Sequence, residues 1–320
     1  MNIGDKKIQS VIPGVSFIPD ATNVGIITEK NGAATDIYLV DSGYSPDMGQ
    51  IILSLLDRQF PPAADGTASY RLRTIFCTHS HADHVNGNVY LAEHTGCSIW
   101  VTKGEQANLE DPVIEQFILC GGYPLPELKT PFYQARPSTA THIIKPEEKT
   151  ELPGGTRLEF IPMPGHHIEM TAILVISPSG KKVLFTGDAI FGRERMKKYW
   201  IPFLFDVGGF KDSLKKLAEI EADFYLPSHG ELITSIKDLS ELNGIAIRST
   251  EDCILKALDT PLTSEEILKA VADKNRISLG LAQYILIGCT IRSYISYLYR
   301  CGRIRYIIKD NRMLWERAGD

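Results

Sequence analysis

The segment that decides the fold is His79-Ser80-His81-Ala82-Asp83-His84, which places four metal-capable side chains within six residues. Neutral imidazoles and a carboxylate are ligands that suit zinc and related divalent metals. Three of the chain's eight histidines fall here, whereas a loop that served only solubility would use Ser, Asn and Lys. The apolar, β-branched run Thr74–Thr78 comes just before and predicts a buried strand. We therefore expect a metal site on the loop at the C-terminal end of that strand, where α/β proteins place their chemistry.

Three segments further along the chain complete a larger pattern. The motif at 79–84 resembles H-x-H-x-D-H, the signature of the metallo-β-lactamase fold superfamily. That resemblance predicts a histidine in a Pro-Gly-His turn, an aspartate that closes a strand as Thr-Gly-Asp or Ser-Gly-Asp, and a histidine in a Pro-x-His-Gly turn. The chain has Pro164-Gly165-His166, Thr186-Gly187-Asp188 and Pro227-Ser228-His229-Gly230 in that order. Each piece is weak alone, but the joint match is strong.

The resemblance implies a site for two divalent metal ions. The implied ligands are His79, His81 and His166 for one ion, Asp83, His84 and His229 for the other, and Asp188 as the bridge. Two cations about 3.5–4 Å apart can share a water molecule and lower its pKa. Asp83 is also the expected catalytic residue, because it can orient the resulting hydroxide. Zinc is the expected metal, with iron or manganese as alternatives that ligand type alone does not separate.

A two-metal site of this kind predicts a hydrolase that uses a metal-bridging hydroxide to cleave a small acyl substrate, a thioester, ester or lactone, as in the glyoxalase II-like branch. The main alternative is a phosphodiesterase or endoribonuclease that acts on single-stranded RNA through the C-terminal part of the chain. A redox or non-catalytic metal protein is the third hypothesis. β-Lactam hydrolysis is not expected, because the bridging Asp188 resembles the hydrolase branches of the superfamily.

The N-terminal part of the chain reads as strands and a helix that lead into the metal loop. Two β-rich segments, 24–28 and 36–41, flank an Asn31-Gly32 turn signal, and residues 48–60 have helical apolar spacing. Asp41 opens an Asp-Ser-Gly turn that resembles one which the superfamily places near the metals. We expect Asp41 to support the ligands, not to be one of them.

Length and pattern together predict two domains. A chain of 320 residues exceeds one typical domain, so a large and a small domain are expected. The resemblance gives residues 1–243 an α/β fold, the αββα metallo-β-lactamase sandwich. In residues 244–320, Thr263-Ser264-Glu265-Glu266 is a capping box, 281–300 carry one apolar helical face, and a hairpin is expected around Asp310-Asn311. Helices followed by a hairpin resemble a winged helix, which trails the catalytic domain in an endoribonuclease-like group of the superfamily.

Charge bears on the choice of partner. The net charge of −5 excludes an overall basic, nucleic-acid-coating protein. Basic residues gather near the C-terminus, and a candidate phosphate-binding face there consists of Arg292, Arg300, Arg303, Arg305 and Arg312. The remaining chain has a net negative charge, which disfavours binding of the phosphates of a polynucleotide. We therefore expect a small-molecule acyl substrate, with nucleic acid as the less favoured alternative, and a winged-helix-like domain that packs against protein in a homodimer.

Residues 105–150 interrupt the strand and helix pattern with prolines and aromatic side chains. Long irregular segments in compact domains are often functional lids, so this insertion is either an apolar wall over the metals or a surface excursion. Tyr123 in this segment, His167 beside the Pro-Gly-His turn, and Arg193 after the Thr-Gly-Asp turn are the candidate substrate-binding residues. An alternative for Arg193 is an ordinary surface ion pair.

The expected location is the cytoplasm, with no membrane association. Met1–Lys7 lack the apolar core of a signal peptide, and no stretch approaches the roughly 20 apolar residues of a membrane span. The six cysteines are scattered without a Cys-x-x-Cys pair, which suits a reducing compartment.

Overall fold

The computed structural model describes residues 6–32, 34–198 and 200–319. These residues form two compact units. The first comprises Met1–Met163, Glu169–Asp188 and Ile220–Ser235, and the second comprises Pro164–Ile168, Ala189–Glu219 and Ile236–Asp320. Residues 1–5, on which the expected lack of a signal-peptide core partly rests, lie outside the described residues.

The first unit contains a seven-stranded sheet in the order β1-β2-β3-β4-β5-β6-β7. Its strands are β1 (Gln9–Ile12), β2 (Val15–Ile18), β3 (Val24–Asn31), β4 (Ala34–Val40), β5 (Tyr70–Phe76), β6 (Ser98–Thr102) and β7 (His142–Ile144). Pairing is antiparallel from β1 to β4 and parallel from β4 to β7. The predicted strands on either side of the Asn31-Gly32 turn are confirmed as β3 and β4. The strand predicted before the histidines is confirmed as β5, which ends at Phe76.

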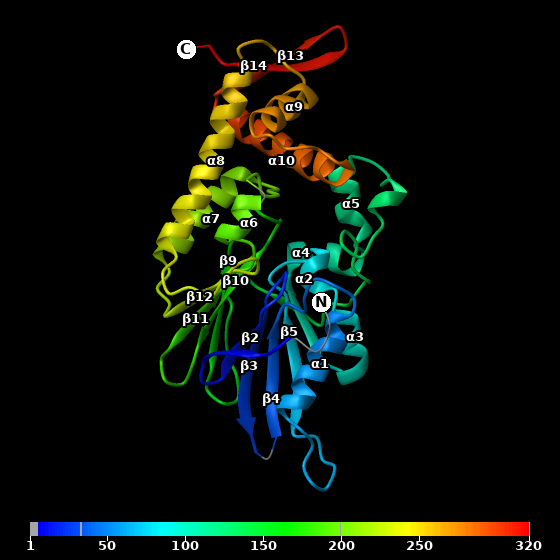
Figure 1. Ribbon diagram of the computed structural model, residues 1–320, viewed down its shortest axis with the longest axis vertical. Coiled ribbons are helices and arrows are strands. Elements are labelled where there is room, and N and C mark those ends of the chain that lie inside the picture. The colour runs from blue at the N-terminus through cyan, green and yellow to red at the C-terminus, as the bar shows by residue number, and fades with distance from the viewer. Residues whose placement is uncertain (1–5, 33, 199, 320) are drawn as a thin grey trace. The chain divides into compact units, whose positions relative to one another are not determined.

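A second sheet of five strands packs against the first within the same unit (Figure 1). Its order is β12 (Phe224–Leu226), β11 (Lys182–Phe185), β10 (Thr171–Ile176), β9 (Arg157–Pro162) and β8 (Lys149–Glu151). Buried side chains from both sheets form one apolar cluster, in which the ring of Phe76 lies 5.5 Å from that of Phe160. All residues of β10 are buried, as expected for a central strand between two paired neighbours.

Helices cover the other face of the seven-stranded sheet. They include α1 (Met48–Gln59), α2 (Ala82–Val85) and α3 (Asn88–Thr95). Ile52 and Leu56 of α1 and Leu91 of α3 pack against the sheet in a second apolar cluster. The helix predicted over 48–60 is thereby confirmed, and this unit has the layer order helix, sheet, sheet (Figure 1).

The segment 105–150 is more regular than its prolines suggested. It includes most of α4 (Lys103–Glu110), then α5 (Val113–Cys120), η2 (Pro126–Leu128), β7 and most of β8. Residues 121–141 are largely irregular, as predicted, but the prediction missed the helix α5, which Pro112 and Gly121 bound and do not break. Gly121 ends α5 with φ of 65°, a left-handed conformation that suits glycine.

The second unit contains helices α6 (Arg193–Lys198), α7 (Val207–Glu219), α8 (Lys237–Ala257), α9 (Ser264–Lys274) and α10 (Leu281–Arg300), with strands β13 (Ile304–Lys309) and β14 (Arg312–Arg317). The predicted capping box is present, because Thr263 accepts from Glu266 N and the Glu266 carboxylate accepts from Thr263 N. The predicted hairpin is also present, and Asp310 and Asn311 have positive φ angles as a tight turn requires.

The winged-helix assignment and the division into residues 1–243 and 244–320 stay predictions. The helices and the hairpin of the C-terminal part have the expected order, but α8 runs without interruption through residues 243 and 244. No helix among the described residues is long and apolar enough to span a lipid bilayer.

Candidate metal centre

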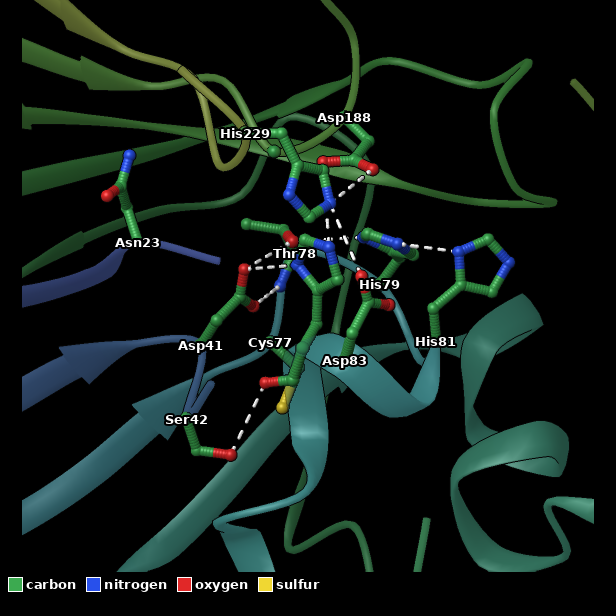
Figure 2. A network of polar contacts seen from close by, with 12 residues as sticks. Asn23, Asp41, Ser42, Cys77, Thr78, His79, His81, Asp83, Asp188 and His229 are labelled. Atoms are coloured by element: carbon green, nitrogen blue, oxygen red, sulfur yellow. Dashed lines mark hydrogen bonds and ion pairs between the residues drawn. The ribbon is translucent and has the colours of Figure 1, made fainter. Parts of the chain in front are cut away.

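Parallel pairing of β4 and β5 places Asp41 beside the histidine loop. Val40 lies opposite Phe76, so the residues that follow both strands meet at one edge of the sheet. Thr78 donates to the buried Asp41 carboxylate from its backbone N at 2.7 Å and from Oγ1 at 2.8 Å (Figure 2). His84 Nδ1 lies 2.8 Å from Asp41 Oδ2. Because a carboxylate only accepts, neutral His84 carries its proton on Nδ1, and the lone pair of Nε2 can then bind a metal.

A second pair of parallel strands, β11 and β12, positions Asp188 and His229. Phe185 of β11 lies opposite Leu226 of β12, and the turns after these strands bring the two side chains together (Figure 2). His229 Nε2 is 3.3 Å from Asp188 Oδ2 and 3.3 Å from Asp83 Oδ2. Gly187 has φ of 56°, and a Cβ there would lie 3.1 Å from Thr78 Cβ, which is tighter than most Cβ contacts. Asp188 therefore approaches the histidine loop through a turn that suits glycine.

Each histidine has an outer nitrogen, which is the ring nitrogen that points away from the cluster. The outer nitrogens of His229 and His79 are hydrogen-bonded to neighbouring oxygens. His229 Nδ1 donates to the Ala21 carbonyl at 2.6 Å, so in the neutral imidazole that binds metal the lone pair is on Nε2. Asn23 Nδ2 donates to the carbonyls of Pro227 and Gly230 at 2.9 and 2.8 Å and fixes the turn that carries His229. Thr78 Oγ1 gives its proton to Asp41, so at 3.1 Å it accepts from His79 Nδ1. Each contact orients one imidazole toward the site.

The facing nitrogens of His79 and His81 give the clearest test of whether a cation fits. His79 Nε2 lies 2.9 Å from His81 Nδ1 (Figure 2). The outer nitrogen of His79 is hydrogen-bonded to Thr78, and the outer nitrogen of His81 lies 3.1 Å from Glu115 Oε1. The carboxylate charge of Glu115 favours the proton of His81 on its outer nitrogen, so in this tautomer the lone pairs of the two inner nitrogens face each other. A cation bound to both nitrogens removes that repulsion, and the donor set therefore fits a divalent metal.

Two overlapping groups of donor atoms lie within 4.8 Å of one another in the first unit. They are His79, His84 and Asp188, and Asp83, His84 and His229. The second group is the ligand set predicted for one of the two ions. His84 Nε2 makes no hydrogen bond with any residue that the structure describes, and it lies 3.5 Å from Asp188 Oδ1. A buried nitrogen in that position suits a metal ligand.

The charged groups of this cluster shift one another's pKa values. Burial alone would lower the pKa of His229, but the carboxylates of Asp188 and Asp83 outweigh it and raise that pKa to about 9. Burial is likewise outweighed for His84, whose pKa is raised by Asp188, Asp41 and Asp83. Burial would raise the pKa of Asp83, but the charges of His84 and His229 hold it well below its usual value. The cluster therefore keeps the Asp83 carboxylate ionised and attracts cations.

The sequence matches the family described as the metallo-beta-lactamase superfamily over residues 18–229. The chain belongs to the metallo-beta-lactamase superfamily. The metallo-beta-lactamase domain-containing protein 1 of Xenopus laevis is 25% identical over 229 residues, which are 64% of this chain and 84% of that protein.

Solved structures agree with this membership at the level of the fold. A beta-lactamase domain protein from Burkholderia ambifaria is similar over 97% of this chain and 93% of its own, with a TM-score of 0.71 and 18% identity. A metallo-beta-lactamase family protein from Thermus thermophilus is similar over 96% of this chain and 100% of its own, with a TM-score of 0.69 and 18% identity. The predicted α/β fold of the metallo-beta-lactamase type is thereby confirmed.

The remaining predicted ligand of this metallo-beta-lactamase superfamily chain belongs to the second unit. His166 is buried in the Pro-Gly-His turn, and its Nδ1 donates to the Phe203 carbonyl at 2.9 Å. Its Nε2 is therefore the nitrogen with a lone pair, as in His84 and His229. Gly165 has φ of 129°, and a Cβ there would lie 2.1 Å from Phe210 N, so the turn requires glycine. The assignment of His166 as a ligand stays a prediction.

The predicted substrate-binding residues differ in their surroundings. His167 is buried in the second unit, where its carbonyl accepts from Gly165 N at 3.1 Å. Arg193 begins α6, and its side chain is 59% exposed and 3.9 Å from Asp238, an arrangement common for surface pairs. Tyr123 is 76% exposed and accepts a hydrogen bond from Lys129 at 2.8 Å. Their roles stay predictions.

Sequence reasoning missed two acidic residues that contact the histidine loop. Glu105 of α4 accepts from Ser80 N at 3.0 Å and from Ser80 Oγ at 2.6 Å. Glu115 of α5 lies beside His81, as described above. Neither belongs to a motif, and both come from the segment that was expected to be irregular. Asp41 has the supporting position that was expected of it.

Proposed function

We propose that this chain is a two-metal hydrolase, with zinc as its metal, that cleaves a small acyl substrate such as a thioester, ester or lactone. The observation that carries the proposal is the exposure of Asp83. Its side chain is 19% exposed, whereas those of Asp188 and His229 are 4% exposed. Asp83 is thus the carboxylate of the cluster that a water molecule and a carbonyl carbon reach from solvent.

The proposed hydrolysis depends on the metal ions and the water molecule that the cluster would bind. Bound divalent cations supply Lewis acidity and lower the pKa of a water molecule at the site. The carboxylate of Asp83 would orient this water and relay the proton that it loses as its oxygen forms a bond to the carbonyl carbon. When the carbon–sulfur or carbon–oxygen bond of the substrate breaks, the same proton passes to the leaving group. His84 and His229, held by Asp41 and by the Ala21 carbonyl, keep their positions through this sequence.

The basic residues of the C-terminal part give weaker support to an RNA substrate. Four of the five arginines of the candidate phosphate-binding face already face carboxylates, in the pairs Arg300–Asp206, Arg303–Glu251, Arg305–Glu316 and Arg312–Glu266. Each pair reduces the positive charge available to a phosphate, and neutralisation of phosphates dominates binding of nucleic acids. We therefore favour the acyl substrate over single-stranded RNA.

The test is turnover of a panel of thioesters and lactones, measured beside single-stranded RNA on protein of known metal content. We expect the wild type and an Asp212→Asn control, which removes an exposed carboxylate, to cleave an acyl substrate. Asp83→Asn should lose about 100-fold or more in rate, since proton transfer by a positioned side chain contributes about 10²–10⁴-fold. Undiminished acyl turnover by Asp83→Asn at matched metal content would contradict this mechanism. RNA cleavage without acyl turnover would favour the alternative.

A further inference from the structure

Glu115 contacts His81 on the side away from the metal cluster. Glu115 Oε1 lies 3.1 Å from His81 Nε2, and the two side chains are only 13% and 10% exposed. The other ring nitrogen of His81 faces His79 at 2.9 Å. A carboxylate 3.1 Å from Nε2 electrostatically favours the tautomer of neutral His81 that carries its proton on Nε2, and so directs the lone pair of Nδ1 toward His79.

Other polar groups fix Glu115 in turn. Asn108 of α4 donates from Nδ2 to Glu115 Oε2 at 3.2 Å and accepts from Glu115 N at 3.1 Å. The same Nδ2 donates to Ser80 O at 3.2 Å and to Ser80 Oγ at 3.1 Å. Ser80 itself donates to Glu105. One network therefore joins α4 and α5 to the residue that precedes His81.

We propose that Glu115 is a positioning residue that fixes His81 as a metal ligand through Nδ1. This inference rests on the proposed function, because it assigns Glu115 a part in building that metal site. It also gives the segment that contains α4 and α5 a role different from that of a lid. These helices support a ligand directly, so the site depends on them whether or not substrate is bound.

The experiment measures metal affinity and not turnover. Metal-stripped wild type, Glu115→Ala and Glu115→Gln compete with a chromophoric chelator for Zn²⁺, and Glu127→Gln serves as the control. Glu127 is an exposed acid of the same segment, so this control matches the change in charge. Loss of a carboxylate behind a ligating histidine weakens metal binding about 10–100-fold. We expect that loss for Glu115→Ala and a smaller one for Glu115→Gln, whose amide oxygen still places a partial negative charge near His81 Nε2. Glu127→Gln should bind as the wild type does.

A His81→Ala background separates positioning from a general structural effect. If Glu115 acts through His81, adding Glu115→Ala to His81→Ala should change the remaining Zn²⁺ affinity by less than about 2-fold, because the two effects share one contact. An equal loss in both backgrounds, or no loss in the wild-type background, would overturn the proposal. Circular dichroism of each metal-stripped variant verifies that it is folded. Failure of the wild type to bind metal would refute the proposed function as well, whereas metal binding without hydrolysis would refute that function alone.

Discussion

Replacement of Asp41 by Asn should damage both the stability and the metal affinity of this chain. Asp41 is buried and accepts three hydrogen bonds, from Thr78 N, Thr78 Oγ1 and His84 Nδ1. Its φ of 60° lies in the left-handed region, which Asn tolerates better than most residues. Asn therefore tests the carboxylate without adding backbone strain. Its Nδ2 is a donor, so it cannot replace the oxygen that now accepts from Thr78 Oγ1 and His84.

The magnitude follows from these bonds. A hydrogen bond to a charged group contributes about 1.5–3 kcal/mol. The bond from Thr78 N survives in the variant, and the Thr78 hydroxyl can rotate to recover part of its own. We therefore expect the free energy of unfolding to fall by about 3 kcal/mol. The amide also donates to His84 Nδ1 and moves the imidazole proton to Nε2, which should weaken metal binding about 10–100-fold.

Two assays on the same preparations measure these effects. Urea unfolding of chelator-treated protein gives the change in free energy, and competition with a chromophoric chelator gives the affinity for Zn²⁺. Asp212→Asn, which alters an exposed carboxylate in an ion pair with Lys215, is the matched control and should change neither quantity. An Asp41→Asn protein that binds Zn²⁺ as tightly as the wild type would refute the argument that Asp41 sets the tautomer of His84.

Two further predictions concern the turn at Gly187 and the charges around His229. Gly187→Ala should lower the free energy of unfolding in urea more than Gly96→Ala does. Both glycines have positive φ, but only at Gly187 would a Cβ meet Thr78. Equal losses in the two variants would contradict this reason. The pKa of His229 is raised to about 9 from an ordinary value of 6.5. The charged His229 therefore stabilises the folded state fully below about pH 6.5, and this stabilisation is lost as pH rises through about 9. Chelator-treated protein should therefore lose stability between those pH values in urea unfolding at a series of pH values. Zn²⁺ should remove this decline, because metal binding requires neutral histidine; a flat profile without metal would refute the assignment.

Local motifs explain why much of the candidate site could be predicted from the sequence. The turns that end at Asp188 and at His229 each follow a short apolar strand, and their residues identify them without knowledge of distant contacts. The capping box at Thr263 and the hairpin turn at Asp310 were predictable for the same reason, because each depends on neighbours within a few residues.

The supporting contacts could not be predicted, because they join residues far apart in the sequence. Glu115 meets His81 from a different helix, and Ala21 meets His229 across 208 positions. An isolated glutamate in a helix carries no sign of such a partner. The helix α5 itself was missed because the whole segment was judged by its prolines and aromatic side chains, although Pro112 is well suited to the start of a helix.

The parallel pairing of β11 with β12 has a consequence for how the protein is made. Asp188 and His229 come together only when β12, whose residues are Phe224–Leu226, lies beside β11. A ribosome that has translated the histidine loop has still to add more than a hundred residues before that pairing can form. The group that contains Asp83, His84 and His229 can therefore assemble only after most of the chain has been synthesised. A chain that is truncated before β12 would lack that site, at any concentration of metal in the cell.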